Sequence, residues 1–138
     1  MKRKVSIYIE GSLKEDQGEN ITTTTEGEYV FFNDKHVIRY KEIVEDSGQA
    51  SRTTLKISPG LVEMSKKGES VTHMVFDLSR ETESVYDTQY GSLYFQVKTT
   101  IINIEEKENQ LFLHMEYALS NMGNPISENC LRVRIKGI

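Results

Sequence analysis

Side chains that could carry acid–base or metal chemistry are scattered along this chain. The three histidines are His36, His73 and His114, and no cysteine or carboxylate stands beside them at a metal-ligand spacing. The chain has no G-x-S-x-G turn for a nucleophilic serine and no glycine-rich loop for a phosphate. The sequence therefore predicts no catalytic residue, no metal ligand and no cofactor.

Cys130 is the single cysteine, and its strand position predicts that it faces outward, two residues before Arg132. A cation beside a thiol lowers the pKa of the thiol and makes it reactive. The simpler interpretation is an unreactive surface thiol. A lone cysteine cannot form an internal disulfide, which fits a reducing cytosol.

Several polar residues occupy positions that strand alternation assigns to the interior. Tyr40 and Tyr117 are two of them, and Glu42 is a third if its strand stays regular. A buried carboxylate must be paired or hydrogen-bonded, and Lys56 or Lys66 could be its partner. These residues form either a hydrogen-bond network in the core or a polar cluster that contacts a ligand.

The segment Tyr86-Asp87-Thr88-Gln89-Tyr90-Gly91 combines alternating polar and aromatic residues with a terminal glycine. The alternation places Tyr86, Thr88 and Tyr90 on one face, and Gly91 permits a positive φ at a corner between two strands. We expect this corner at one end of the fold. It is either a structural corner held by tyrosine hydrogen bonds or part of a ligand site, in which Thr88 and Tyr90 face Lys66 or Tyr117.

The elements that must position these residues are strands. The chain has 138 residues, of which 12 are Ile, 10 Val and 11 Thr but only 2 are Ala. β-Branched residues favour the pleated sheet over the helix. Period-2 alternation of apolar and polar residues continues almost from end to end. It covers residues 4–13, 21–32, 36–44, 52–58, 61–67, 70–78, 93–104, 111–119 and 131–136.

This pattern predicts one all-β domain over residues 1–138, with nine or ten strands, a bend at Gly27 and a bulge near Ile101. Leu93, Phe95, Val97 and alternate residues of the last two segments are expected to form the C-terminal core. Long antiparallel strands in meander order suit a closed barrel, because closure removes exposed sheet edges. A two-sheet sandwich is the alternative.

Charge and hydropathy limit the partners. The net charge is −4 and the isoelectric point is about 5.4, which argues against a nucleic-acid-binding module. No run approaches the apolar length of a membrane span, and the alternation that begins at Val5 is unlike a signal peptide. We expect a cytoplasmic protein with neither a membrane nor a nucleic acid as its partner, and the sequence leaves its oligomeric state open.

Four segments occur in an order that resembles the YwiB-like family of small bacterial proteins, a domain of unknown function. They are Thr54-Leu55-Lys56-Ile57, Val62 to Glu69, Met74-Val75-Phe76 and the box from Tyr86 to Gly91. The family often has Pro where this chain has Gln89 and Arg where it has Lys66. The resemblance implies a bacterial cytoplasmic protein with a closed antiparallel barrel of about eight strands, calycin-like and related in shape to lipocalins. It implies no established activity.

Three function classes follow from these observations. The first is a non-catalytic module that binds a small ligand, since a small barrel can hold one molecule inside. Its expected ligand-binding residues are Thr88, Tyr90, Tyr117, Lys66, Tyr40 and Glu42. The second is a protein–protein adaptor that uses the outer barrel surface. The third is an enzyme with a Tyr/Thr/Lys/Glu site at the barrel mouth.

Overall fold

The computed structural model describes residues 3–14, 16–43, 50–68 and 70–138, and these residues form ten strands and no helix. The all-β prediction is therefore confirmed. The strands are β1 (Arg3–Leu13), β2 (Asp16–Phe32), β3 (Lys35–Ile43), β4 (Ala50–Ser58), β5 (Leu61–Lys67), β6 (Val71–Asp77), β7 (Thr82–Thr88), β8 (Gly91–Lys107), β9 (Gln110–Asn121) and β10 (Asn124–Gly137). Val44, the last residue of one predicted strand, lies outside the described residues.

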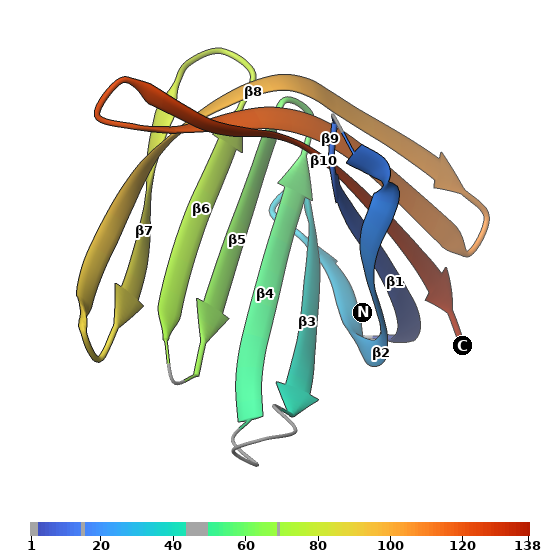
Figure 1. Ribbon diagram of the computed structural model, residues 1–138. Helices are drawn as coiled ribbons and strands as arrows, with labels where there is room; N and C mark the ends of the chain where they lie inside the picture. Colours follow the sequence, from blue (N-terminus) through green and yellow to red (C-terminus); the bar gives the residue numbers. More distant parts are fainter. Residues whose placement is uncertain (1–2, 15, 44–49, 69) are drawn as a thin grey trace.

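Every strand pairs antiparallel with its neighbour in the chain, and β1 also pairs with β10, which closes the sheet into a barrel (Figure 1). The closure rules out the two-sheet sandwich. The barrel has ten strands rather than the eight expected from the family resemblance, because each turn-bounded alternating segment forms a strand of its own. No helix among the described residues is long and apolar enough to cross a membrane.

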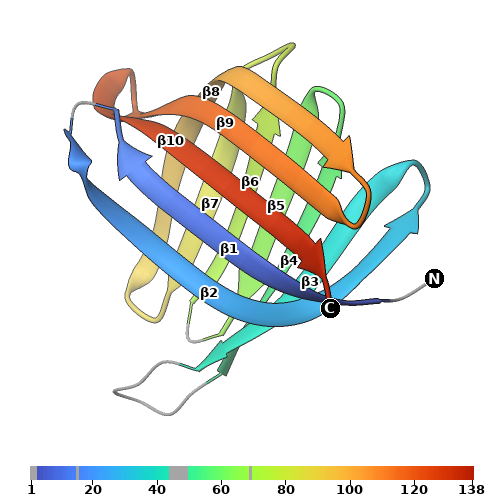
Figure 2. The ribbon, with the colours of Figure 1, turned by 90° about the vertical axis from the view of Figure 1, so that its right-hand side faces the viewer.

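The barrel is flattened, so that two groups of strands cross each other. In Figure 2, β1, β8, β9 and β10 run diagonally in front of β3 to β7. The strand β2 belongs to both groups, because its residues Gly27 to Tyr29 pair with β1 on one side and with β3 on the other. Gly27 lies where the strand curves from one wall to the next, as the sequence predicted, and a Cβ there would lie 2.4 Å from the carbonyl oxygen of Arg39.

The turns and the bulge follow the local chemistry of the sequence. Asn33 and Asp34 adopt φ values of 52° and 61° between β2 and β3, which Asn and Asp tolerate better than most residues. The pairing of β8 with β9 shifts between Thr99 and Ile101, which confirms the predicted bulge. This shift keeps the apolar residues after Ile101 on the inner face of β8.

The apolar core is concentrated at one end of the barrel. In the C-terminal strands Val97, Leu111, Leu113, Met115, Val133 and Ile135 are buried, as predicted. Leu93, Phe95 and Leu131 were expected to join them, yet 52 % of the surface of Leu93 is exposed and the other two are half-buried. Leu93 lies on the same face of β8 as Val97. It is four residues closer to the other end of the barrel, where solvent reaches the inner wall.

Candidate ligand site at the open end of the barrel

The inner face can be followed as rows of paired residues that run around the barrel. One row crosses six strands from β3 to β8, and each residue in it has the same inward parity as buried neighbours on its own strand. This row, here called the polar row, consists of Tyr40, Thr53, Lys66, Thr72, Tyr86 and Leu93. Its members carry four hydroxyl groups and one ammonium group.

On most strands, solvent exposure of the inner face rises from one end of the barrel to the other. The strand β4 is an exception, because Ser51, Thr53, Leu55 and Ile57 are all buried. On β5, Val62 is 0 % exposed, whereas Met64 and Lys66 are half-buried. On β7, Ser84 is buried and Tyr86 is 38 % exposed. Strands β1, β6, β9 and β10, and the first half of β8 from Leu93 to Val97, show the same change in the same direction. Water therefore reaches more of the inner wall at this end, although Tyr29, Ile102 and Ile104 at the other end are half-buried.

We call this end, where β7 leads into β8 and β9 into β10, the open end; it lies on the left in Figure 2. At the closed end, on the right, β2 leads into β3 and β8 into β9. The inner wall near the closed end is apolar and buried, and its residues include Ile57, Val62, Phe76 and Val97. This core forms the floor of the interior.

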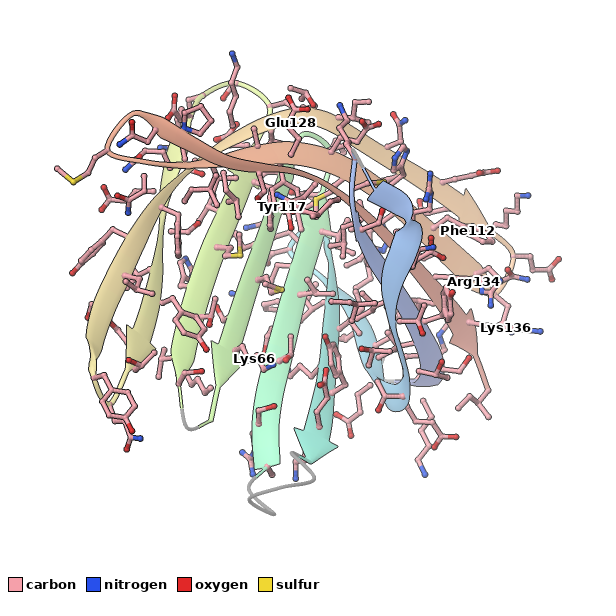
Figure 3. All side chains as sticks on the ribbon, in the orientation of Figure 1. Lys66, Phe112, Tyr117, Glu128, Arg134 and Lys136 are labelled. Carbon is pink, nitrogen blue, oxygen red and sulfur yellow. The ribbon has the colours of Figure 1, made fainter. Side chains whose placement is uncertain are left out.

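The structure brings most of the predicted ligand residues to the open end. Tyr40 and Lys66 lie in the polar row, and Glu42 and Thr88 lie two residues further along the same faces of β3 and β7, at the rim. Tyr117 faces them from β9 on the opposite wall. In Figure 3, Lys66 and Tyr117 lie within the outline of the barrel, whereas Phe112, Arg134 and Lys136 lie on its outer wall.

Tyr90 is not part of this group. It occupies the tight turn between β7 and β8 and is 91 % exposed, so its ring points into solvent. The corner itself forms as predicted, with Gly91 at a φ of 130°, but no tyrosine hydroxyl holds it. Instead, the Thr88 hydroxyl donates to the Gly91 carbonyl oxygen (3.0 Å) and accepts from the Tyr90 amide (3.1 Å).

Tyr40 and Tyr117 are un-ionised at neutral pH. Burial raises the pKa of Tyr40 to about 12, although a hydrogen bond with Thr53 partly opposes this rise. Burial also raises the pKa of Tyr117, whose ring packs edge-on against Phe76 with 4.7 Å between ring centroids. These tyrosines can offer hydroxyl groups and apolar rings to a ligand, but not a negative charge.

Several inward hydroxyl groups have no hydrogen-bond partner among the described residues. They belong to Ser51, Ser84 and Thr99, whose side-chain oxygens are fully buried. Lys66 likewise forms no ion pair within the part of the chain that the structure describes, and Lys56, the other proposed partner of Glu42, is exposed on the outer face. A buried hydroxyl without a partner is costly, but these three oxygens are out of reach of solvent, whereas Lys66 is half-buried and open to a further polar contact.

At the closed end, His36 seals the floor. It is buried, with its Nδ1 atom 2.7 Å from the Tyr29 hydroxyl and its Nε2 atom 3.3 Å from a carboxylate oxygen of Glu106. Phe31 packs on the ring, with centroids 5.1 Å apart. Burial lowers the pKa of His36. The structure thus places His36 at the end of the barrel that is closed.

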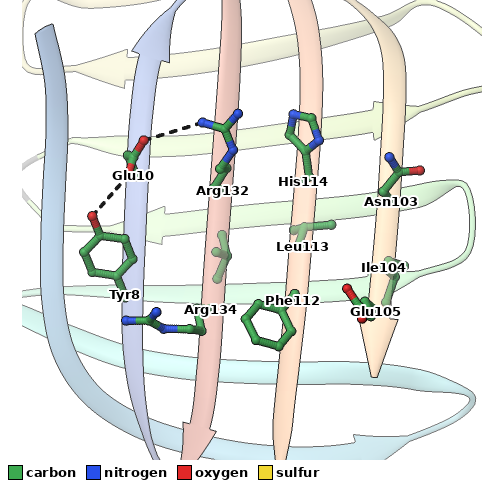
Figure 4. A pocket seen from close by; sticks show the side chains of 11 residues that line it. Tyr8, Glu10, Asn103, Ile104, Glu105, Phe112, Leu113, His114, Arg132 and Arg134 are labelled. Carbon is green, nitrogen blue, oxygen red and sulfur yellow. Dashed lines mark hydrogen bonds and ion pairs between the residues drawn. The ribbon is translucent and has the colours of Figure 1, made fainter. Parts of the chain in front are cut away.

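The outer wall carries a shallow groove of about 420 Å³ over β1, β8, β9 and β10 (Figure 4). The Arg134 guanidinium lies 5.2 Å from the centre of the Tyr8 ring, and Arg132 pairs with Glu10 at 3.5 Å. Phe112 and His114 line the groove from β9. The cations of this groove are thus interleaved with aromatic rings and carboxylates.

Cys130 lies beside this groove, with its Sγ atom 3.4 Å from Nε2 of His114. Burial raises the pKa of the thiol, and the opposing effect of Arg132 is smaller. The thiol is therefore mainly protonated at neutral pH, which agrees with the simpler interpretation and not with a reactive cysteine. Among the described residues, no cluster of three or more His, Cys, Asp or Glu side chains could hold a metal ion.

Sequence reasoning missed Met64, Met74 and Thr72 as candidate ligand residues. Met64 pairs with Met74, and Thr72 pairs with Lys66, all on the exposed part of the inner wall. Alternation identified the face of each residue, but it made the methionines look like ordinary core. The sequence did not show how far Met64, Met74 and Thr72 lie from the open end, because that distance depends on how the strands pair with one another.

These features define a closed antiparallel β-barrel with a filled apolar floor and a polar row at its open end. The chain belongs to the family described as the domain of unknown function DUF1934, whose model matches residues 7–133. The crystal structure of the ywiB protein from Bacillus subtilis aligns with it at a TM-score of 0.84 and 20 % sequence identity, covering 99 % of this chain and 93 % of that one. The family match confirms the expected family, and the structural likeness confirms the expected fold. No curated protein matches the chain.

Proposed function

We propose that this protein is a non-catalytic binding protein, and that a small ligand enters its barrel through the open end. The graded exposure of the inner wall is the observation that supports this function. Solvent reaches Met64, Met74 and Tyr117, which face inward, while the floor below them is closed. Small-molecule sites typically combine such an apolar wall with a few convergent polar groups.

The calycin-like character of the barrel agrees with this proposal, although a shared architecture alone does not assign a function. A cytoplasmic location and a small-molecule partner, rather than a nucleic acid or a membrane, belong to the same proposal. The protein–protein adaptor remains the second candidate, because the outer groove exposes Tyr8 and Phe112 beside Arg134. Aromatic and arginine side chains are enriched at protein interfaces.

The proposed function can be tested with N-phenyl-1-naphthylamine, a neutral apolar dye that fluoresces in dry pockets. The variant Met74→Trp places a large ring on the inner wall of β6, and His73→Trp places the same ring on the exposed outer wall. We expect the wild-type protein and His73→Trp to bind the dye alike, and Met74→Trp to bind it at least about tenfold more weakly.

Thermal melts of both variants check that they are folded, and Met64→Trp replaces Met74→Trp if the latter does not fold. Equal dye binding by the inner-wall and outer-wall variants would contradict the proposal. So would the absence of dye binding to the wild-type protein. Native mass spectrometry of protein purified from its own host would then show whether a ligand is retained.

A further inference from the structure

Ionisable residues are rare on the exposed part of the inner wall. The rim row lies next to the polar row, closer to the open end, and includes Glu42, Ser51, Thr88 and Gly91. Among the described residues of these two rows, Lys66 is the only cation and Glu42 the only carboxylic acid. Two hydroxyl-bearing neighbours, Thr53 and Thr72, pair directly with Lys66 on either side. Lys66 therefore lies between two threonines in the row, of which Thr53 bonds to Tyr40 and Thr72 is half-buried.

Glu42 does not neutralise this charge. It lies on β3, with β4 between it and β5, and it is one row closer to the rim than Lys66. The two residues form no ion pair within 4.0 Å. Glu42 lies close enough to Tyr40 for its charge to contribute to the raised pKa of that hydroxyl. The acid thus belongs to the environment of Tyr40, not to that of Lys66.

The wall beneath Lys66 is apolar. Met64 lies one inward position deeper on β5 and pairs with Met74, and Val62 and Phe76 close the floor below them. Four residues of strand separate Lys66 from Val62, which corresponds to about 13 Å along the wall. Methionine side chains adapt to irregular apolar shapes, so this stretch suits a flexible chain better than a rigid planar ring.

From this arrangement we infer that the ligand is an amphipathic anion, with its acidic head at Lys66 and an unbranched apolar chain lying over Met64 and Met74. This inference rests on the proposed function and specifies its ligand class. The head group replaces the water around the Lys66 ammonium with a charge-assisted hydrogen bond, and the half-buried Thr72 offers a hydroxyl donor to the same head. A ligand covering Lys66 without an acidic group would leave a desolvated, unpaired charge.

Calorimetric titration with three probes of one chain length tests the head group: octanoate, octan-1-ol and octylammonium. Lys66→Met removes the ammonium but keeps much of the side-chain length. Lys67→Met is the matched control, because Lys67 is the next residue on β5 and is exposed on the outer face. Lys66→Gln is the second variant if Lys66→Met does not fold.

We expect octanoate to bind the wild-type protein and Lys67→Met equally, and more tightly than the other two probes. Lys66→Met should weaken octanoate binding roughly ten- to a hundredfold and leave octan-1-ol binding unchanged. Equal affinity for all three probes, insensitive to Lys66→Met, would overturn the assigned head group while the proposed function stands. Tightest binding of octylammonium, weakened by Glu42→Gln, would also overturn it.

A protein that binds N-phenyl-1-naphthylamine at its inner wall but none of the three octyl probes would refute the amphipathic ligand alone. Failure of the dye and of all three probes would refute both this inference and the proposed function. The two proposals can therefore fail separately.

Discussion

The side chains of His36 and Lys66 show how burial decides the role of a titratable residue in this barrel. Both face inward, but His36 lies at the closed end, where an aromatic ring, a hydroxyl and a carboxylate surround it. Lys66 lies near the open end, where solvent and hydroxyl groups reach it. We interpret the histidine as a structural seal and the lysine as a binding residue.

The seal at His36 predicts a pH dependence of stability. Burial lowers the pKa of His36 below its ordinary value of 6.5, so the unfolded chain takes up a proton before the folded protein does. The contribution of His36 to stability is therefore complete above pH 6.5 and is lost progressively as the pH falls below it. Denaturant unfolding measured between pH 7.5 and about pH 5 should show this decline.

The matched variants are His36→Gln, which cannot titrate, and His73→Gln, which changes a histidine exposed on the outer wall. We expect the decline to become shallower in His36→Gln and to stay unchanged in His73→Gln. The acids whose pKa is lowered, Asp77 and Glu116, titrate below this window. A decline in His36→Gln as steep as in the wild-type protein would contradict the assigned role of the histidine.

Among the elements, β2 most clearly depends on one residue for its shape. It has 17 residues and passes from one wall of the barrel to the other at Gly27 (Figure 2). The absence of a side chain lets the carbonyl oxygen of Arg39 and the side chain of Ile7 approach closely. Closure of the barrel through β1, β2 and β3 relies on this close approach.

This close approach predicts that Gly27→Ala is destabilising. The new Cβ would lie 2.4 Å from a backbone oxygen and 2.8 Å from Cδ1 of Ile7, so the strands must move apart. Overpacking of this kind costs about 1–3 kcal/mol. Gly11→Ala on β1 is the control, because its Cβ would find its nearest neighbour, in Leu131, at 3.8 Å. Equal unfolding free energies for the two variants would argue against the role of Gly27.

At the scale of the whole molecule, the barrel has a rigid floor and an exposed rim. The residues around Ile57, Val62 and Phe76 are buried, whereas Tyr86 and Leu93 on the same inner face are exposed. Local opening requires less energy where few apolar contacts must be broken. The rim is therefore the part of the barrel that can adjust to a ligand while the floor stays intact.

Amide hydrogen exchange measured by NMR tests this division. We expect the paired amides of β4 and β5 near Ile57 and Val62 to exchange at least about tenfold more slowly than the paired amides of β7 and β8 near Tyr86 and Leu93. A ligand bound at the open end should slow exchange at the rim more than at the floor. Uniform protection along the strands would contradict a rigid floor with a mobile rim.

The amino-acid sequence alone determined the strands, their faces and most of their turns. A residue's face on a strand follows from its parity, which is a local property, so Tyr40 and Tyr117 could be assigned to the interior. Lys66 was not distinguished from Lys56, which lies on the outer face. The bulge near Ile101 and the bend at Gly27 were also predictable, because each disturbs a local pattern. Tyr90 was assigned wrongly, because parity no longer applies once the chain enters a turn.

Only the tertiary structure decided how deep each inward residue lies and which end of the barrel is open. Val97 and Leu93 have the same parity and similar chemistry, yet one is buried and the other is exposed. Their burial differs because different residues pair beside them on the neighbouring strands. The two walls also cross, so that side chains bury Val97 but not Leu93. Such pairings join residues that are distant in the chain, so no local pattern records them, and the neighbours of Lys66 became known only with the closed barrel.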